Sequence, residues 1–529
     1  MKKLKAALIL DNMKVAEWQR LALEEASDLL DIKLVLNCKN TKIKKSLRKN
    51  FLYYSMNFFT LRNSLTKSSE YNLSDEEVLD FNSVYNNNWQ SIPKTISEHL
   101  SNEGFDVIIK FGMSLLRVDE SLSVLPVLSF HHGDPSKFRG RPAGFYELLF
   151  NEEKSGLIVQ KLNNELDAGE ILAFAESKLV HYSYKKSAEQ FYKQSQFLLR
   201  KALVNLNMNS SISMGKDGNN YRLPSNFSVI QFLLILSTRR IKHLTYGAFI
   251  EKKWRVGTFA FKPNLRCENI IDSSSINELA IEPEYTFYAD PLFSSDGSKI
   301  RLEALSKKSG LGDILEIDLD SLNRPKLLLT GDHYSYPFSF LLNEVEQILP
   351  EVGSHSPQYF YSLENNEKKK VFLKGLENKR LADSTLIHYN KSWYLFFGEV
   401  KFANSVLNLW TSDTITGEFK EHPKSPICIS PSSARMAGPI LLTKNGLFRF
   451  GQNNNRSYGS SITISEITTL SPNMYDEEVC GSIKMNDCLG PHTIDFQKDT
   501  GMALIDYYTD NFSLFAGVRR LKALLSNNW

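Results

Sequence analysis

The sequence predicts a multidomain protein with an α/β half followed by an all-β half that forms a five-bladed β-propeller. Over roughly the first 120 residues, apolar segments of strand length alternate with segments of helical periodicity, as in an α/β sheet. From about Trp254, short apolar strands alternate with turns, and a loose motif recurs about every 45–55 residues. Five units of this length are what five four-stranded sheets around an axis need.

The N-terminal half contains the elements of a doubly wound sheet. Buried strands are predicted at residues 6–10, 32–36 and 105–112, and helices at 15–30 and 92–100. Residues 40–88 are rich in Lys, Asn and Ser and are expected to be an irregular insertion. No GxGxxG motif follows the first strand, which argues against a nicotinamide or flavin dinucleotide.

Composition narrows the class of protein. The chain of 529 residues is long for one domain, and its 42% hydrophobic and 23% charged residues are typical of a globular protein. A net charge of +3 gives no global argument for a nucleic-acid partner. The five cysteines are scattered without CxxC spacing, so we expect reduced thiols, a cytoplasmic location and no metal.

One segment outside the strands is strongly apolar. Residues 227–236 (FSVIQFLLIL) are followed by Arg239, Arg240 and Lys242. The run is too short to span a bilayer, and no run of about 18 apolar residues occurs elsewhere. Two interpretations remain open: a core or domain-interface helix, and a peripheral contact with an inner membrane surface.

Residues 124–172 hold the densest group of candidate site residues. An apolar strand at 124–130 leads into His131 and His132 and then a basic loop, and a second strand at 156–162 is followed by Asp167. Loops at strand ends are where polar groups are positioned for chemistry.

This stretch resembles the formyltransferase family that uses 10-formyltetrahydrofolate. The turn KFRG at residues 137–140 lies at the family's spacing from His131, and DAGEI at residues 167–171 matches its D-x-G-x-[IL] motif. The resemblance implies a Rossmann-like formyltransferase domain over residues 1–205, with 10-formyltetrahydrofolate as formyl donor. It also implies cofactor contacts from four residues, Phe111, Gly112, Met113 and Gly169.

Formyl transfer needs an oxyanion stabiliser and a route for a proton. His131 suits both roles, and Asp167 would orient its imidazole, as the family's matching residues do. His131 could instead be a loop histidine bonded to the backbone. The family has an Asn that donates to the formyl oxygen, and Ser129 occupies its position here. Because the serine side chain is shorter, the enzyme could be slower, re-tuned or inactive.

Four neighbouring residues are candidate substrate ligands, each with a structural alternative. His132 could contact substrate or support the fold, and Asp134 could recognise an amine or sugar hydroxyls or cap a turn. Arg139 and Arg141 could bind a phosphate or be ordinary surface charges.

The β half, expected at residues 251–529 after a helical linker at 206–250, carries a second set of motifs. They are Ala289-Asp290-Pro291, Glu303, residues 435–439 (RMAGP), Gln452, Tyr458-Gly459 and His492. With these residues it resembles the five-bladed propellers of arabinanase-like glycoside hydrolases. It is more similar still to the propeller of plant glucosamine inositolphosphorylceramide transferases.

Glycoside hydrolysis needs two carboxyl groups, one of them protonated. Asp290 and Asp383 fall where the hydrolases carry a base and a supporting Asp, but Ala437 replaces the acid before Gly-Pro. Glu303 is a possible substitute acid, yet a carbohydrate-binding role is favoured. The candidate pocket residues are Asp290, Glu303, Asp383, Arg435, Gln452 and His492. Trp410, Tyr458 and Tyr507 could stack on sugar rings or form blade core.

These observations predict transfer of a formyl group from 10-formyltetrahydrofolate to an amino sugar. The sugar would be nucleotide-linked, and the pathway would be assembly of a surface polysaccharide or glycoconjugate. The propeller would bind carbohydrate, and nucleic acid is not expected as a partner. The alternative is a catalytically degenerate formyltransferase fold serving a carbohydrate-binding or glycosyltransferase-associated propeller protein.

Overall fold

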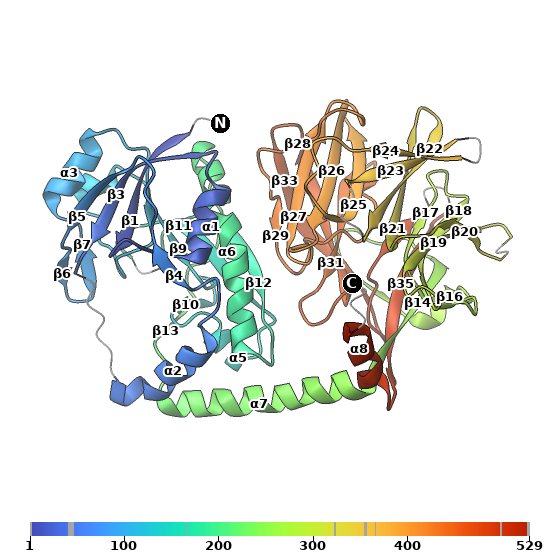
Figure 1. Ribbon diagram of the computed structural model, residues 1–529, viewed down its shortest axis with the longest axis horizontal. Helices are drawn as coiled ribbons and strands as arrows, with labels where there is room; N and C mark the ends of the chain where they lie inside the picture. The colour runs from blue at the N-terminus through green and yellow to red at the C-terminus, as the bar shows by residue number, and fades with distance from the viewer. Residues whose placement is uncertain are drawn as a thin grey trace. The chain divides into compact units, whose positions relative to one another are not determined.

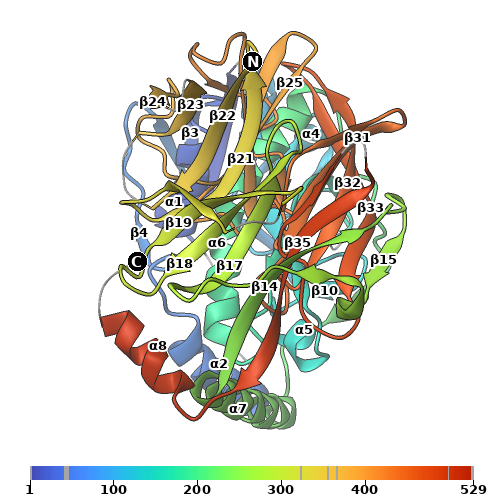
Figure 2. The same cartoon turned by 90° about the vertical axis from the view of Figure 1, so that its right-hand side faces the viewer.

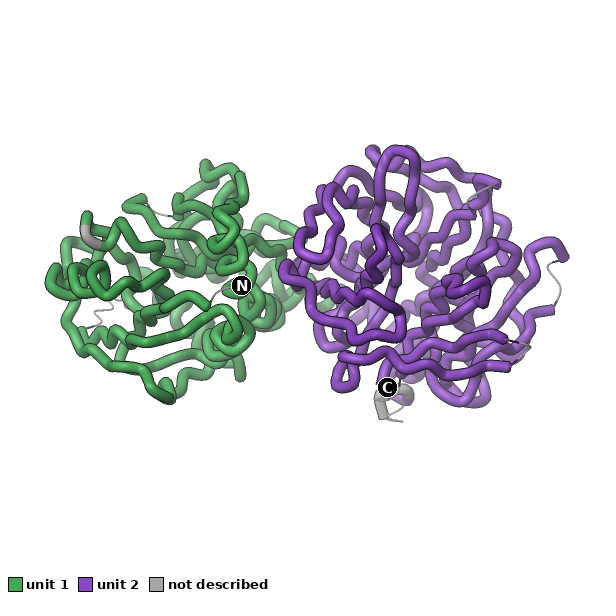
Figure 3. Tube along the Cα trace, turned by 90° about the horizontal axis from the view of Figure 1, so that it is seen from above, with its two compact units in different colours: residues 1–241 green, residues 242–529 purple. Residues whose placement is uncertain are grey.

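The computed structural model describes residues 3–40, 47–165, 167–321, 324–353, 357–364, 367–497 and 500–525. The chain divides into two compact units, residues 1–241 (unit 1) and 242–529 (unit 2), as Figures 1 and 3 show. Helix α7 (Asn226–Phe249) runs across this division. The boundaries expected at residues 205 and 250 stay a prediction.

Unit 1 is built on a nine-stranded sheet with a parallel centre. Its central strands are apolar on both faces, as strands covered by helices must be. From edge to edge the main strands are β12 (Glu170–Lys178), β11 (Lys154–Lys161), β9 (Val127–His131), β8 (Val107–Lys110), β1 (Leu4–Asp11), β3 (Leu30–Cys38) and β5 (Glu77–Phe81). The short strands β2 (Lys14–Ala16) and β4 (Ser68–Glu70) extend β1, whereas β6 (Val84–Asn86) pairs with β7 (Trp89–Ser91) and β10 (Phe138–Gly140) with β13 (Asn219–Tyr221).

Helices cover both faces of this sheet. Val127 of β9 joins the core formed with α3 and α4, whereas Phe130, on the opposite side of the same strand, packs against Trp18 of α1. Helices α1 and α6 pack on each other, and α6 also lies along β12. The helices are α1 (Glu17–Glu25), α2 (Leu47–Thr60), α3 (Lys94–Asn102), α4 (Glu120–Ser123), α5 (Phe145–Leu149) and α6 (Tyr184–Asn207).

Two expectations for this half are wrong. Residues 40–88 include helix α2 and strand β5, which pairs in parallel with β3, although residues 41–46 lie outside the described part. Strand β5 has the sequence EVLDF, and only its last residue, Phe81, is buried. Helix α1 ends at Glu25 rather than at residue 30, because Leu30 already begins β3.

Unit 2 is a five-bladed β-propeller, which confirms that part of the predicted fold (Figure 2). The ring closes where its first long strand, β14 (Ile250–Ala260), pairs antiparallel with its last, β35 (Met502–Phe512). One sheet consists of β17 (Tyr285–Phe293), β18 (Lys299–Ser306), β19 (Gly312–Asp318) and β20 (Lys326–Leu329). The next consists of β21 (Tyr334–Leu342), β22 (Val345–Val352), β23 (Tyr359–Glu364) and β24 (Glu367–Phe372). A third consists of β25 (Leu381–Tyr389), β26 (Ser392–Glu399), β27 (Val406–Ser412) and β28 (Lys420–Glu421), and β29 (Cys428–Ile429) also pairs with β27. The fourth sheet consists of β30 (Leu441–Thr443), β31 (Gly446–Asn453), β32 (Ser461–Leu470), β33 (Tyr475–Met485) and β15 (Glu268–Ile271). The fifth consists of β34 (Ile494–Phe496), β35, β14 and β16 (Asn277–Glu278). Helix α8 (Ala516–Leu525) follows β35.

The recurring sequence motif marks a bulge in the first strand of three sheets. Asp290 in β17, Tyr336 in β21 and Asp383 in β25 have φ angles of 47°, 43° and 48°. The pairing register with the next strand shifts at each of these places. A left-handed conformation costs a non-glycine residue about 1–2 kcal/mol, so each bulge must be held by its surroundings.

Helix α7 contains the apolar segment 227–236. Only Val229 and Phe232 of this helix are buried, so it is not a core helix. Among the described residues, no helix has the length and apolar content needed to cross a membrane.

Gly438 provides a test of the propeller geometry. Its φ is 150°, and a Cβ there would lie 2.0 Å from the carbonyl oxygen of Ile494, at the entrance to β34. We expect Gly438→Ala to destabilise unit 2 by roughly 3 kcal/mol, because backbone would have to move. Gly310→Ala is the matched control, since its φ is 73° but a Cβ would meet nothing within 4 Å; it should lose about 1 kcal/mol. Urea unfolding followed by fluorescence measures both, and equal losses would contradict the described packing.

Candidate functional site

His131 and Asp167 are in contact in unit 1. His131 ends β9, and Asp167 occupies the turn between β11 and β12 with a φ of 50°. The imidazole Nδ1 lies 3.2 Å from Asp167 Oδ1, with side chains 10% and 14% exposed. The other carboxylate oxygen accepts the Gly140 N–H at 3.0 Å. The contact fixes the orientation of the imidazole and leaves its buried Nε2 without a hydrogen-bond partner among the described residues.

A cavity of about 700 Å³ adjoins this pair and is lined by Ser129, Lys110, Gln160 and Arg141 among others. Ser129 and Gln160 are opposite one another on β9 and β11. Burial lowers the pKa of Lys110 to about 8, although the carboxylates of Asp11 and Asp167 oppose this shift. Sequence reasoning missed Lys110 and Gln160; a lone charge at the end of the apolar run VIIK was the available signal for Lys110.

The predicted cofactor residues separate into two groups. Phe111, Gly112 and Met113 line an adjoining cavity of about 860 Å³, which shares Lys110 and Arg141 with the first. Gly169 instead donates its N–H to Gln160 Oε1 at 2.9 Å, and a Cβ there would lie 2.3 Å from the carbonyl oxygen of Lys161. Gly169 therefore serves the tight β11–β12 turn.

His132 points away from His131. Its Nε2 lies 2.9 Å from Ser195 Oγ, and its ring packs edge-on against Trp18 and Tyr192. Burial, together with the nearby His131, lowers the pKa of His132 to about 3. The ring is thus neutral and supports the packing of α1 and α6.

The other candidate substrate ligands differ in their contacts. Asp134 Oδ1 accepts the Ser136 N–H at 2.9 Å, so this side chain caps a turn, as the structural alternative predicted. Arg139 Nε donates to the carbonyl oxygen of Gly218 at 2.7 Å. Arg141 is the one basic residue of this loop that lines both large cavities described above.

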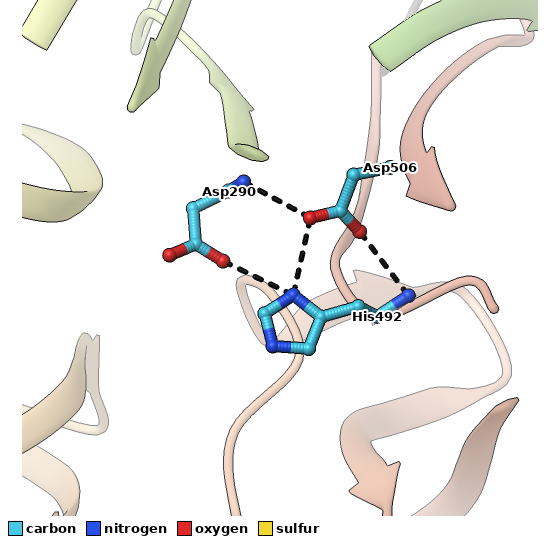
Figure 4. A group of neighbouring side chains, drawn as sticks. All are labelled: Asp290, His492 and Asp506. Atoms are coloured by element: carbon cyan, nitrogen blue, oxygen red, sulfur yellow. Dashed lines mark hydrogen bonds and ion pairs between the residues drawn. The ribbon is translucent and has the colours of Figure 1, made fainter. Parts of the chain in front are cut away.

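At the propeller axis, His492 lies between two carboxylates (Figure 4). Its Nδ1 is 3.1 Å from Asp506 Oδ2 and 3.3 Å from Asp290 Oδ1, and all three residues are buried. Burial opposes the charged form, but Tyr458, Asp506 and Asp290 together raise the pKa of His492 well above its usual value. The geometry is that of a protonated imidazole bridging two acids.

The same three side chains offer a spacing at which a cation could be held, with their ligand atoms within 4.8 Å of one another. The Asp506 oxygens, however, already accept the backbone N–H groups of Asp290, His492 and Thr493, at 3.0, 3.1 and 2.6 Å. The two carboxylate oxygens of Asp506 therefore already have hydrogen-bond partners in the protein and do not need a cation. Asp506 was missed from the sequence because β35 carries no motif that distinguishes it.

A second axial cluster centres on Asp383. Arg435 Nε donates to its Oδ2, and Gln452 Nε2 donates to the same oxygen at 3.2 Å. The Asp383 N–H, aimed by the bulge in β25, donates to Glu351 Oε2 at 3.1 Å. Tyr458 links the clusters, because its ring packs against His492 and lies under the Arg435 guanidinium.

Two glutamic acids at the axis favour the protonated form. Burial and the neighbouring Asp383 raise the pKa of Glu351 to about 8, and burial and Asp290 raise that of Glu303 well above its usual value. The structure thus places Glu303, the possible substitute acid, close to Asp290, whereas Glu351 was missed from the sequence. Tyr507 is blade core, being buried with its hydroxyl donating to Glu278, and Trp410 packs against the core of unit 2.

Comparison with known proteins places the similarity in the propeller. A protein-family model described as "Glucosamine inositolphosphorylceramide transferase 1, N-terminal" matches residues 327–489. Glucosamine inositolphosphorylceramide transferase 1 of Arabidopsis thaliana is 29% identical over 206 residues, 36% of this chain and 27% of that protein. The protein of the same name from Oryza sativa subsp. japonica is 29% identical over 151 residues, 27% of this chain and 20% of that protein. The chain spans about a quarter of the length of the curated relatives it matches.

Solved structures are more distantly similar. Phosphoribosylglycinamide formyltransferase from Anaplasma phagocytophilum is 12% identical, with 41% of this chain and 98% of that chain covered, at a TM-score of 0.29. An exo-β-1,3-galactanase from Phanerochaete chrysosporium is also 12% identical, with 34% and 48% covered, at a TM-score of 0.26.

Formyl transfer is therefore wrong as the predicted function. The matching curated proteins are named as transferases of another kind, and the family match lies in the propeller. The substitution of the family's amide donor by Ser129 agrees with this correction, because a hydroxyl on β9 reaches less far than an amide. What the comparisons support is a relationship to transferases through the propeller.

The raised pKa of Glu351 predicts a pH-dependent stability. Its folded-state pKa lies above the unfolded value, so the stability it contributes is complete below about pH 4.5 and is lost as the pH rises through 8. Because the side chain is 19% exposed, we expect a loss on the order of 2 kcal/mol rather than the full shift. Glu351→Gln should flatten the profile between pH 5 and 9 in urea unfolding.

Glu367→Gln, at an exposed position of β24, is the matched control and should leave the pH profile as in the original protein. A profile that Glu351→Gln and the control change equally would contradict the assignment.

Proposed function

We propose that unit 2 binds the carbohydrate of a glycolipid or related glycoconjugate at its axis. The chain would then be a carbohydrate-binding, glycosyltransferase-associated propeller protein. The observation that carries this proposal is the position of Glu351, Asp383, Arg435 and Gln452. All four lie inside the segment that matches the transferase family, and they converge on one site.

The chemistry of the axis suits a hydroxyl-rich ligand. Arg435 and Glu351 keep 16% and 19% of their side chains exposed, whereas Asp383 and Gln452 are buried behind them. Sugar hydroxyls can accept from the Arg435 guanidinium, and they can both donate to and accept from the protonated carboxyl group of Glu351.

Two buried polar atoms at the axis support a ligand more directly. Gln452 Oε1 and His492 Nε2 have no hydrogen-bond partner among the described residues. Buried polar atoms are rarely left unsatisfied, because an unmade hydrogen bond costs about 1–3 kcal/mol. Ligand hydroxyl groups would satisfy both atoms, because a hydroxyl can donate to the amide oxygen of Gln452 and accept from the Nε2–H of the protonated His492.

A second candidate, sugar transfer at this axis, is favoured by the pairing of Glu351 with Asp383. One carboxyl group has a raised pKa, while the other is held by Arg435. Glycosyl transfer needs one protonated carboxyl group as the general acid and one carboxylate as the general base. Glu351 would protonate the oxygen of the leaving group, and the carboxylate of Asp383 would take the proton of the acceptor hydroxyl.

In this proposal unit 1 has a degenerate, Rossmann-like formyltransferase fold. The parallel order β5-β3-β1-β8-β9 and the contact between His131 and Asp167 support that fold. An amino sugar or sugar nucleotide would enter the cavity lined by Lys110 and Arg141, where the cationic groups would meet phosphate. Binding of 10-formyltetrahydrofolate stays a prediction and is separable from formyl transfer.

We expect Asp383→Asn to weaken sugar binding at least about tenfold, since the carboxylate that orients Arg435 and Gln452 is lost. Saturation-transfer NMR and calorimetry with glucosamine, N-acetylglucosamine and inositol phosphate measure the affinity on the full chain. Asp413→Asn, at an exposed turn of the propeller, is the matched control. Failure of the original protein to bind any of these sugars, or equal binding by both variants, would refute the proposal.

A further inference from the structure

Helix α7 exposes an apolar stripe, which Ser237 interrupts between Leu234 and Ile241. Five side chains on one side of the helix are 49–76% exposed: Phe227, Ile230, Leu234, Ile241 and Leu244. At 100° per residue they fall within a sector of roughly 100°, so they form one face. An apolar face of this length is normally buried, and surface helices of globular proteins turn such a face inward.

The opposite side of α7 shows why the stripe faces outward. Val229 and Phe232 are fully buried, and the Phe232 ring stacks on Phe145 of α5 with centroids 4.2 Å apart. Arg239, from the next turns, donates to the carbonyl oxygen of Leu148 at 2.7 Å. These contacts dock the side of the helix opposite the stripe onto unit 1, so the stripe cannot be buried in unit 1 without breaking them.

The charge around the stripe has one sign. Residues 226–249 contain Arg239, Arg240 and Lys242 and no Asp or Glu. Arg240 and Lys242 are both exposed. An apolar face with a cationic border is the pattern of helices that lie in the interface of an anionic bilayer.

Helix α8, in unit 2, and the residues just before it also expose apolar side chains. It packs beside the end of α7, where Arg520 donates to the carbonyl oxygens of Gly247 and Ile250 at 2.6 Å, and the two helices lie together in Figures 1 and 2. The segment exposes four apolar side chains, Leu514, Phe515, Val518 and Leu521. Lys522 is also exposed.

Helix α2 does the same at the other end of α7, in unit 1. The Leu52 N–H donates to Asn226 Oδ1 at 3.0 Å, which joins α2 to the start of α7. Helix α2 exposes three aromatic rings, Phe51, Phe58 and Phe59, and the Arg62 guanidinium lies over Phe58. Within unit 1, the start of α7 thus lies beside exposed apolar and cationic side chains.

We propose that α7 is an interfacial helix that holds this protein against an anionic lipid bilayer, with its apolar stripe among the acyl chains and Arg240 and Lys242 at the headgroups. The charges around the stripe favour an anionic bilayer over a second copy of the chain as its partner. A second copy of α7 would bring like cationic borders together, and residues 226–249 contain no Asp or Glu to pair with them, whereas anionic lipid compensates them. The site is independent of the sugar site and goes beyond the proposed function.

Co-sedimentation of the full chain with vesicles tests the proposal. The protein should bind vesicles of phosphatidylcholine with phosphatidylserine, bind those of phosphatidylcholine alone more weakly, and lose affinity as salt is added. Leu234→Glu with Leu244→Glu should reduce binding at least about tenfold, because two charges enter the apolar face. Leu341→Glu with Leu442→Glu, at propeller positions 54% and 60% exposed, is the matched control and should bind as the original protein does.

A charge variant separates the two contributions. Arg240→Gln with Lys242→Gln should weaken binding to anionic vesicles by about fivefold per charge and reduce its salt dependence. Lys326→Gln with Lys374→Gln, both at exposed propeller positions, is its control. The proposal is overturned if the original protein stays in the supernatant with anionic vesicles, or if the stripe variant binds as tightly as its control. It is also overturned if light scattering shows a lipid-free dimer that only the stripe variant dissociates.

Discussion

The pairing of β14 with β35 is the contact on which the propeller depends. These strands come from opposite ends of unit 2 and pair along their full length, so main-chain hydrogen bonds close the ring. Strand β35 also carries Asp506, whose buried carboxylate accepts N–H groups from Asp290 and His492. The strand that joins the ends therefore also builds the axis, and the site depends on closure of the ring.

Burial of several acids at one axis decides which of them are charged. The Arg435 guanidinium compensates Asp383, and the His492 imidazole compensates Asp290 and Asp506. Glu303 and Glu351 have raised pKa values, because burial and a neighbouring carboxylate both favour the neutral form. The axis thus combines carboxylates that only accept hydrogen bonds with carboxylic acids that can donate one. A ligand whose hydroxyl groups do both matches this mixture.

The parts of this protein that sequence could predict are those with a local pattern. The propeller was predictable because each left-handed bulge recurs in a similar motif, and His131 and Asp167 were paired through motifs of known spacing. Contacts such as that of Asp290 with Asp506, 216 residues apart, leave no such pattern. The reaction was wrongly predicted because motifs at strand ends report a fold that can serve many functions.

The exposed stripe of α7 gains its meaning from the nature of the proposed ligand. Apolar side chains left in water forfeit about 25 cal/mol for every Å² that burial would have removed from solvent, and in α7 only Val229 and Phe232 are buried. A carbohydrate carried on a lipid is presented at a bilayer surface, so a protein that binds it works beside that surface. Attachment through α7 would keep the propeller there between encounters, raising the effective concentration of the glycolipid without adding a contact to the sugar. Sugar recognition at a buried axis and attachment through an exposed helix use different residues, so either can be lost while the other remains.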